Sequence, residues 1–212
     1  MEDNEARKKD GEAEGQTKVD IEVTPSVDYE VIVRDKDGNV IQRQKGPSRS
    51  YLKAYNQLLL ALMSRVARTF ADTSGVNRTC EAFSTYALRV LAVAGNISWG
   101  TRVGAGLTAV DISDYALETP IAHGVGAGQL DHLAVTVSTP TVTATESAYT
   151  VKRIFLNKSG GTIVVTEIGM YCIGRGIAPP YYFCIVRDVL GVPVVIPDGG
   201  AITVIYSFKA VA

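Results

Sequence analysis

The chain of 212 residues contains few of the residue types that build metal centres, disulfide frameworks and many active sites. It has three cysteines and two histidines. Cys80, Cys172 and Cys184 share no CxxC spacing, so the sequence indicates neither a zinc site nor a disulfide framework. One bridge stays open, between Cys172 and Cys184 on consecutive expected strands, against the alternative of buried free thiols.

Long apolar runs and a strong net charge are also missing. The longest apolar run, Leu58–Met63, is far shorter than the roughly 20 residues of a membrane-spanning helix, and the charged N-terminus has no apolar signal region. The formal net charge of −1 provides no field to hold nucleic acid or an anionic membrane. We therefore expect a protein made in a cytoplasm, with no nucleic-acid partner and no membrane partner.

The N-terminal quarter divides into an arm and a hairpin. Residues 1–26 are charged and poor in large apolar side chains, so burial cannot offset the cost of ordering them, and we expect a flexible arm. Val27–Arg34 and Val40–Gln44 alternate in polarity on either side of the turn Asp35–Asn39, which predicts a β-hairpin. Gly46–Ser48 is expected to end it.

A helix is predicted next, capped by Ser48 or Ser50 and ending near Thr69–Ala71. Large apolar residues recur at steps of three and four residues, which places them on one face. We take this stripe as a candidate assembly interface; its members are Leu52, Tyr55, Leu59, Leu62 and Val66. Leu58, Leu60 and Met63 widen the stripe, so the sheet or a neighbouring subunit is expected to cover the helix.

Beyond residue 70, short alternating segments joined by turns predict strands and no second long helix. The clearest are Tyr149–Phe155, Thr162–Tyr171, Tyr181–Val186, Val192–Ile196 and Ala201–Phe208. This pattern predicts a mainly β fold, an antiparallel β-sandwich of jelly-roll or Greek-key type with one N-terminal amphipathic α-helix. The expected domains are the arm 1–26, a hairpin and helix over 27–70 packed on the main domain, and a sandwich over 71–212.

The motifs that suggest chemistry have structural explanations that we favour. Gly104–Ala109 fits a dinucleotide-binding glycine pattern, but Val110–Asp114 is a poor helix, so a surface loop is expected there and at Gly124–Gly128. Three carboxylates offer oxygen ligands to calcium, those of Asp111, Asp114 and Glu118. Asp111 and Asp114 equally serve as turn and cap residues, which we favour.

The remaining candidates are two histidines and three asparagines. His123 and His132, the latter beside Asp131, lack a recognisable nucleophile, so a catalytic triad is not favoured. Three segments match the N-glycosylation pattern, for which turn chemistry is the competing explanation: Asn77–Thr79, Asn96–Ser98 and Asn157–Ser159. We expect no catalytic residues, no cofactor and no metal.

One long segment carries a family resemblance. Residues 99–124, WGTRVGAGLTAVDISDYALETPIAHG, resemble uncharacterised virion proteins of tailed phages and related prophage or environmental viral sequences. The similarity continues through Gly128–Leu130, Phe155–Gly161, Val165–Tyr171, Arg187–Leu190 and Val195–Gly200, and more weakly back to Val31–Met63. The resemblance implies a virion component and names no catalytic residue.

Together these features predict a non-enzymatic virion structural protein, made in the host cytoplasm. It is expected to self-assemble, as a trimer or a ring, and to dock with other virion proteins on a capsid or tail as a decoration or accessory component. Two alternatives remain. One is a carbohydrate- or receptor-binding sandwich that uses the glycine loops; the other is a cell-surface filament subunit assembled by strand exchange.

Overall fold

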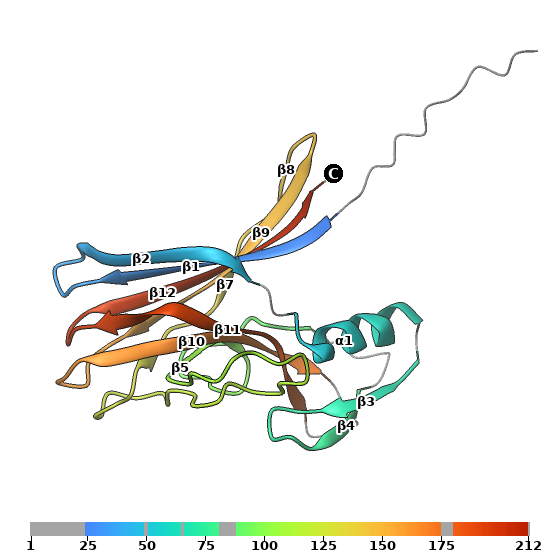
Figure 1. The fold of residues 1–212 in the computed structure, drawn as a ribbon, viewed down its shortest axis with the longest axis horizontal. Coiled ribbons are helices and arrows are strands. Elements are labelled where there is room, and N and C mark those ends of the chain that lie inside the picture. The colour runs from blue at the N-terminus through green and yellow to red at the C-terminus, as the bar shows by residue number, and fades with distance from the viewer. Residues whose placement is uncertain (1–23, 49–50, 65, 81–87, 175–179, 212) are drawn as a thin grey trace, which may run out of the picture.

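The computed structural model describes residues 24–48, 51–64, 66–80, 88–174 and 180–211. Two antiparallel sheets lie face to face, and a single α-helix in the described residues lies at one end of them (Figure 1). The predicted class, a mainly β antiparallel sandwich with one helix, is confirmed, while its jelly-roll form stays a prediction. Residues 1–23 of the expected arm 1–26 lie outside the described residues, and its last three residues belong to the first strand.

The larger sheet, sheet A, has the strand order β2-β1-β12-β9-β6. Its strands are β1 (Thr24–Arg34), β2 (Val40–Ser48), β12 (Ala201–Val211), β9 (Glu146–Leu156) and β6 (Asp131–His132). Two further short strands, β7 (Thr136–Val137) and β8 (Thr141–Val142), also pair with β9.

The N-terminal hairpin belongs to the sandwich itself. Strand β1 pairs with β12 along its whole length, from Thr24 opposite Val211 to Arg34 opposite Ala201. The hairpin, which was expected in a unit of residues 27–70 packed on the sandwich 71–212, is therefore part of the main sheet. Strand β2 also runs through Pro47, where a break was expected, because an edge strand tolerates a residue without an N–H.

The smaller sheet, sheet B, has the order β11-β10-β5, with β11 (Tyr181–Ile196), β10 (Ile163–Gly174) and β5 (Gly100–Gly104). Strand β11 is one long strand where two were expected, and its pairing with β10 shifts register between residues 165 and 167. A separate hairpin, β3 (Arg68–Ala71) and β4 (Asn77–Cys80), lies beside the helix. Buried side chains of both sheets, such as Val204 and Ile168, form the core between them.

The three cysteines are buried, and none of them forms a disulfide within the described residues. Cys172 packs in the main core, whereas Cys184 belongs to a second cluster with Tyr171 and Leu117. Cys172 lies opposite Phe183 in the pairing of β10 with β11, and Cys184 lies opposite Tyr171. Because successive side chains of a strand point to opposite faces, the two thiols lie on different faces of sheet B and cannot pair.

Helix α1 (Lys53–Ser64) packs on β11 and β3. It ends earlier than expected, because β3 begins at Arg68. Among the described side chains of the helix, those of Ala54, Leu58 and Ala61 are buried. This face is rotated about the helix axis relative to the predicted stripe. Two of its three residues are alanines, because the helix packs closely against the sheet.

The structure separates the residues of the predicted assembly interface. Leu52 is buried just before the helix, Tyr55 and Leu59 are half-buried, and Val66 lies beyond the helix and is 52% exposed. The side chain of Leu62 lies outside the described residues. The stripe is therefore not one continuous surface, and its role in assembly stays a prediction.

Candidate interaction surfaces

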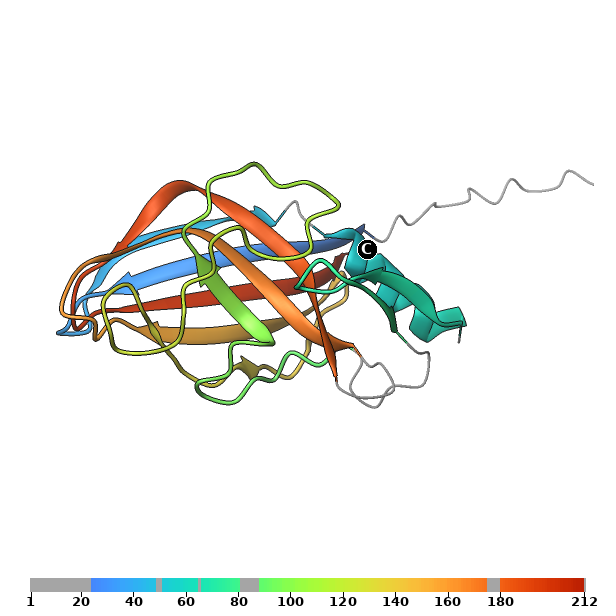
Figure 2. The same ribbon diagram turned by 90° about the horizontal axis from the view of Figure 1, so that it is seen from below.

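The long connection from β5 to β6 forms a layer over the outer face of sheet B. We call residues 105–130 the loop layer; Figure 2 shows it in front of the strands of sheet B. It contains no named helix or strand, and its path is fixed by side chains together with a few backbone hydrogen bonds, such as that from the N–H of Ile121 to the carbonyl of Val103 at 3.0 Å. Most of the segment with the family resemblance lies in this layer.

Glu167, on β10, anchors the two ends of the first part of the loop layer. Its carboxylate is fully buried. Oε1 accepts hydrogen bonds from the backbone N–H of Gly106 at 3.0 Å and of Thr119 at 2.8 Å. Oε2 accepts from the N–H of Glu118 at 3.1 Å. One carboxylate therefore satisfies three backbone amides of a loop that has no ladder of its own.

The glycine pattern at Gly104–Ala109 is explained by this carboxylate. A Cβ placed on Gly104 would lie 2.4 Å from Oε1 of Glu167, and one on Gly106 would lie 2.6 Å from the same atom. Glycine is needed because the backbone approaches a buried side chain. The expectation of a loop at this position is confirmed, although Gly104 itself ends β5.

Arg187, on β11, fastens the middle of the loop layer. Its side chain is 2% exposed. Nε donates to Glu167 at 3.0 Å, Nη1 to Asp114 Oδ2 at 2.7 Å and Nη2 to the carbonyl of Thr108 at 3.0 Å. Burial works against the charge, but the hydrogen bonds to Asp114 and Glu167 outweigh it and raise the pKa of Arg187. The guanidinium thus links both carboxylates to the sheet.

The three carboxylates considered as calcium ligands serve as turn and loop anchors. Asp111 Oδ1 accepts from the N–H of Ser113 at 2.8 Å, and Asp114 accepts from Arg187. Glu118 Oε2 accepts from the N–H of Leu107 and Thr108, and these bonds, that to Thr108 first, lower its pKa. The turn interpretation is confirmed. In the part of the chain that the structure describes, no three His, Cys, Asp or Glu residues are grouped to hold a metal.

The outer surface of the loop layer is apolar. Leu107 is 70% exposed, Ile112 63%, Val125 59% and Tyr115 46%. Isolated exposed apolar residues are normal, but several on one rigid layer are typical of a contact surface. The loop layer is therefore our first candidate interaction surface.

The two histidines lie near the edge of sheet A. The backbone N–H of His132 donates to Nδ1 of His123 at 3.1 Å, and Asp131 Oδ1 lies 3.8 Å from the same nitrogen. His132 is fully buried, and its ring nitrogens have no hydrogen-bond partner among the described residues. Burial and then the nearby Arg102 and Arg153 lower the pKa of His132 to about 3. His132 is therefore a neutral core residue.

Two of the three glycosylation matches are turn residues. Asn157 is buried, and its amide donates to the carbonyls of Gly161 at 2.8 Å and Ile196 at 2.9 Å. Asn96 Oδ1 accepts from the N–H of Ser98 at 2.8 Å. Asn77 is exposed at the start of β4. Turn chemistry explains Asn96 and Asn157.

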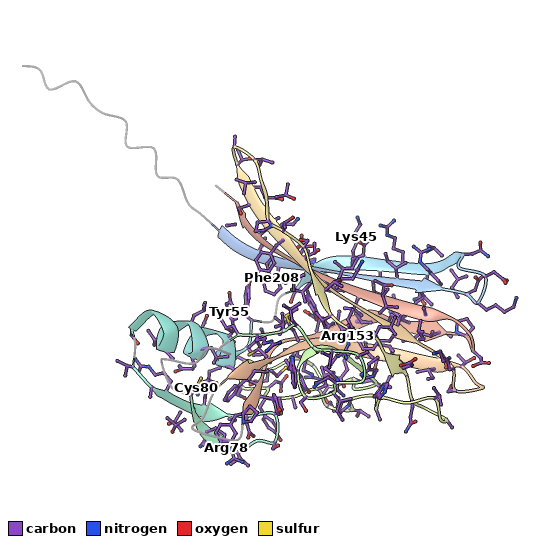
Figure 3. All side chains as sticks on the ribbon, turned by 180° about the vertical axis from the view of Figure 1, so that it is seen from behind. Lys45, Tyr55, Arg78, Cys80, Arg153 and Phe208 are labelled. Carbon is purple, nitrogen blue, oxygen red and sulfur yellow. The ribbon has the colours of Figure 1, made fainter. Side chains whose placement is uncertain are left out.

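Arg153 is a buried residue that our sequence analysis missed. Its guanidinium lies inside the sandwich (Figure 3) and donates to backbone carbonyls, at 2.7 Å to Leu133, 3.0 Å to Thr101 and 2.7 Å to Asn96. Burial and then Arg102 lower the pKa of Arg153 to about 10, so it stays charged at neutral pH. The signal was available, because Arg153 takes an inward position in the alternation of β9.

The second candidate surface is one end of sheet A, which we call the extension: Thr24–Ser26, Thr141–Thr150 and Phe208–Val211. In Figure 1 this end projects away from sheet B, above the helix. Tyr149 and Phe208 stack with ring centroids 5.1 Å apart. Tyr51 and Tyr55 stack with ring centroids 4.4 Å apart, and Figure 3 shows Tyr55 on the helix and Phe208 at the base of the extension.

Burial, followed by the proximity of Tyr55 and Tyr149, raises the pKa of the Tyr51 hydroxyl. The aromatic residues are thus close enough to interact, and they join the extension to the helix. Tyr149 remains 39% exposed, and Val142 near the tip is 72% exposed. The extension therefore packs against aromatic residues at its base, and its side chains are exposed towards its tip.

Comparison with known proteins gives no relative: no family model, no curated protein and no solved structure matches the chain. Among the described residues, no helix has the length and apolar character needed to cross a membrane. Function is therefore inferred from the fold and from the two surfaces.

Proposed function

We propose that this protein is a non-enzymatic structural component of a virus particle, which associates with copies of itself and docks on a capsid or a tail. The extension carries the proposal. Strands that continue past the sandwich bury little within one chain, and they present backbone edges and apolar side chains to a neighbour. The resemblance of residues 99–124 to phage virion proteins points in the same direction.

The buried charges support a building block of fixed shape. Glu167 and Arg187 hold the loop layer against sheet B, and Arg153 holds the segment at Asn96 and the residue Leu133 against β9. Identical contacts repeated in an assembly require each copy to present the same surface, and buried hydrogen-bonded networks favour a single conformation. Such a network suits a repeated component of a decoration or accessory type.

One observation favours the second candidate, a carbohydrate- or receptor-binding sandwich. A hollow of about 420 Å³ is lined by Tyr29, Tyr51 and Asp188 together with apolar residues that include Ile112 of the loop layer. Tyrosine rings stack on the apolar faces of sugars, so Tyr29 and Tyr51 carry this candidate. Asp188 is buried and accepts from the hydroxyls of Ser48 and Tyr206, so it serves the fold first. This hollow differs from the glycine loops that the sequence suggested for such a role.

Size-exclusion chromatography with light scattering of the full chain tests the proposal. We expect a mass of several chains at micromolar concentration, and particles of uniform shape by electron microscopy. A monomer over the whole concentration range, combined with binding on a glycan array, would instead favour the carbohydrate-binding candidate.

A further inference from the structure

The loop layer is an acidic face. Residues 105–130 contain three carboxylates, those of Asp111, Asp114 and Glu118, and no lysine or arginine. Arg187 lies beneath the layer and pairs with Asp114 at 2.7 Å, with Glu118 at 3.7 Å and with the buried Glu167 at 3.0 Å. One guanidinium thus faces these three carboxylates and that of Asp111, so the layer keeps a negative charge. Around these carboxylates lie the exposed side chains of Leu107 and its apolar neighbours. The surface therefore combines negative charge with apolar contact area.

The outer face of sheet A carries more cations than carboxylates; its carboxylates are Asp28, Glu30, Asp131 and Glu146. Its cations are Arg34, Arg43, Lys45, Lys152 and Lys209. Two of them are neutralised within the chain, by ion pairs of Arg43 with Glu30 at 2.6 Å and of Lys209 with Asp28 at 2.9 Å. Lys45 and Lys152 make no ion pair with a described carboxylate, and both are exposed. This face thus retains unpaired positive charge.

The basic face also has apolar contact area. Ile205 lies between Glu30 of β1 and Lys152 of β9 in the strand pairing, and Ile154 and Ile32 flank Thr203 in the next row. All three isoleucines are half-buried on a side of the sheet that no second layer covers. An apolar centre edged by lysines is complementary to the apolar and acidic loop layer.

We propose that the loop layer of one copy binds the outer face of sheet A of a second copy. This inference rests on the proposed self-association and specifies which face of one copy contacts which face of the next. Pairing the same face of two copies would bring like charges together, carboxylates on the loop layers or lysines on the sheets, which opposes binding. Opposite faces attract, so the contact is head-to-tail.

The two faces lie on opposite sides of the sandwich, as Figures 1 and 2 show together. Each copy can therefore hold two neighbours at once, one on each face. A head-to-tail contact of this kind produces a ring when the rotation between copies closes and a filament when it does not. The charged rims set the orientation and the rate of encounter, and the apolar centres supply contact area.

Two double variants test the direction of the contact. The sheet variant, Lys45→Glu with Lys152→Glu, places carboxylates opposite the acidic loop layer and leaves its own loop layer intact. The loop variant, Leu107→Asn with Val125→Asn, removes two exposed apolar groups of the loop layer and leaves its own sheet A face intact. A matched control, Lys36→Glu with Val76→Asn, makes the same changes in two turns outside both faces, where Lys36 is 72% and Val76 45% exposed.

We expect each variant alone to be monomeric by light scattering at concentrations where the wild type and the control assemble. Mixed in equal amounts, the two variants should form a complex of two chains and no larger species, because one intact face of each kind remains. Thermal unfolding followed by circular dichroism verifies that each variant folds.

Variants that are folded, monomeric alone and still monomeric when mixed would overturn the head-to-tail contact. A variant that still forms a dimer alone, through its one intact face, would also overturn it and would indicate pairing of like faces. Variants that assemble as the wild type does would show that these faces are not in contact. A monomeric wild type would remove the proposed self-association, and this inference with it.

Discussion

At the scale of single residues, the buried charges hold backbone that has no regular hydrogen-bonding pattern. Arg153 donates to carbonyls at Asn96, Thr101 and Leu133, which belong to three separate stretches of the chain. A charged group without water is tolerated only when its donors are satisfied. Arg153 meets this condition with carbonyl oxygens, so it connects loops as well as filling the core.

Replacing Arg153 should therefore destabilise the fold strongly. Arg153→Met keeps much of the apolar stem but leaves several buried carbonyls without a donor, and we expect a loss of about 3–5 kcal/mol in the free energy of unfolding. Arg153→Lys retains the charge but cannot span the three segments, so its free energy of unfolding should lie between those of the wild type and the methionine variant. Urea denaturation measures both. A loss below about 1 kcal/mol for the methionine variant would show that the network is dispensable.

His132 predicts a pH dependence of stability. Its pKa is lowered from 6.5 to about 3 in the folded chain, so between these values the unfolded chain binds a proton that the folded chain does not. The free energy of unfolding therefore falls as the pH drops from about 6.5, by roughly 3 kcal/mol at pH 4. At neutral pH this contribution is absent.

His132→Leu removes both the titration and two buried nitrogens without a described partner. We expect the variant to lose less stability than the wild type between pH 7 and pH 4, as measured by urea denaturation at several pH values. Parallel stability curves for the two proteins would show that His132 is protonated in the folded state or is not buried.

At the scale of elements, helix α1 is held by a face of small and large apolar residues. Leu58→Ala should cost about 2–5 kcal/mol, because the side chain is fully buried and leaves a cavity. Leu59→Ala, half-buried, should cost about 1 kcal/mol, and Leu60→Ala, 43% exposed, about 0.5 kcal/mol or less. Thermal unfolding ranks the three. Equal losses for Leu58 and Leu59 would place the helix in a different rotation.

The elements also show which parts of the fold can be predicted from sequence. The alternation of polar and apolar residues predicts strands β9, β10 and β12, because successive side chains of a strand point to opposite faces. The path of the loop layer cannot be predicted in this way. The N–H of Gly106, for example, donates to Glu167, which is 61 positions away in the sequence. The buried face of α1 was missed for a related reason: Ala54 and Ala61 are buried because the sheet lies close, which only the tertiary structure reveals.

At the scale of the whole molecule, the sandwich has two unlike faces and one projecting end. The loop layer is acidic and apolar, the outer face of sheet A is basic with an apolar centre, and the extension reaches past the body above the helix. The exposed side chains of these surfaces, such as Leu107, Lys152 and Val142, take no part in the core of a single chain. Their combination is what a component with several neighbours needs, both for contact between copies and for docking on a larger lattice.

Membership of a virus particle is tested most directly by quantitative mass spectrometry of gradient-purified, nuclease-treated particles from cells that carry the gene. We expect peptides of this protein in the particle fraction, at a constant ratio to the major capsid protein and in many copies per particle. Peptides found only in the soluble fraction of the host, with none in particles of verified purity, would contradict the proposed function.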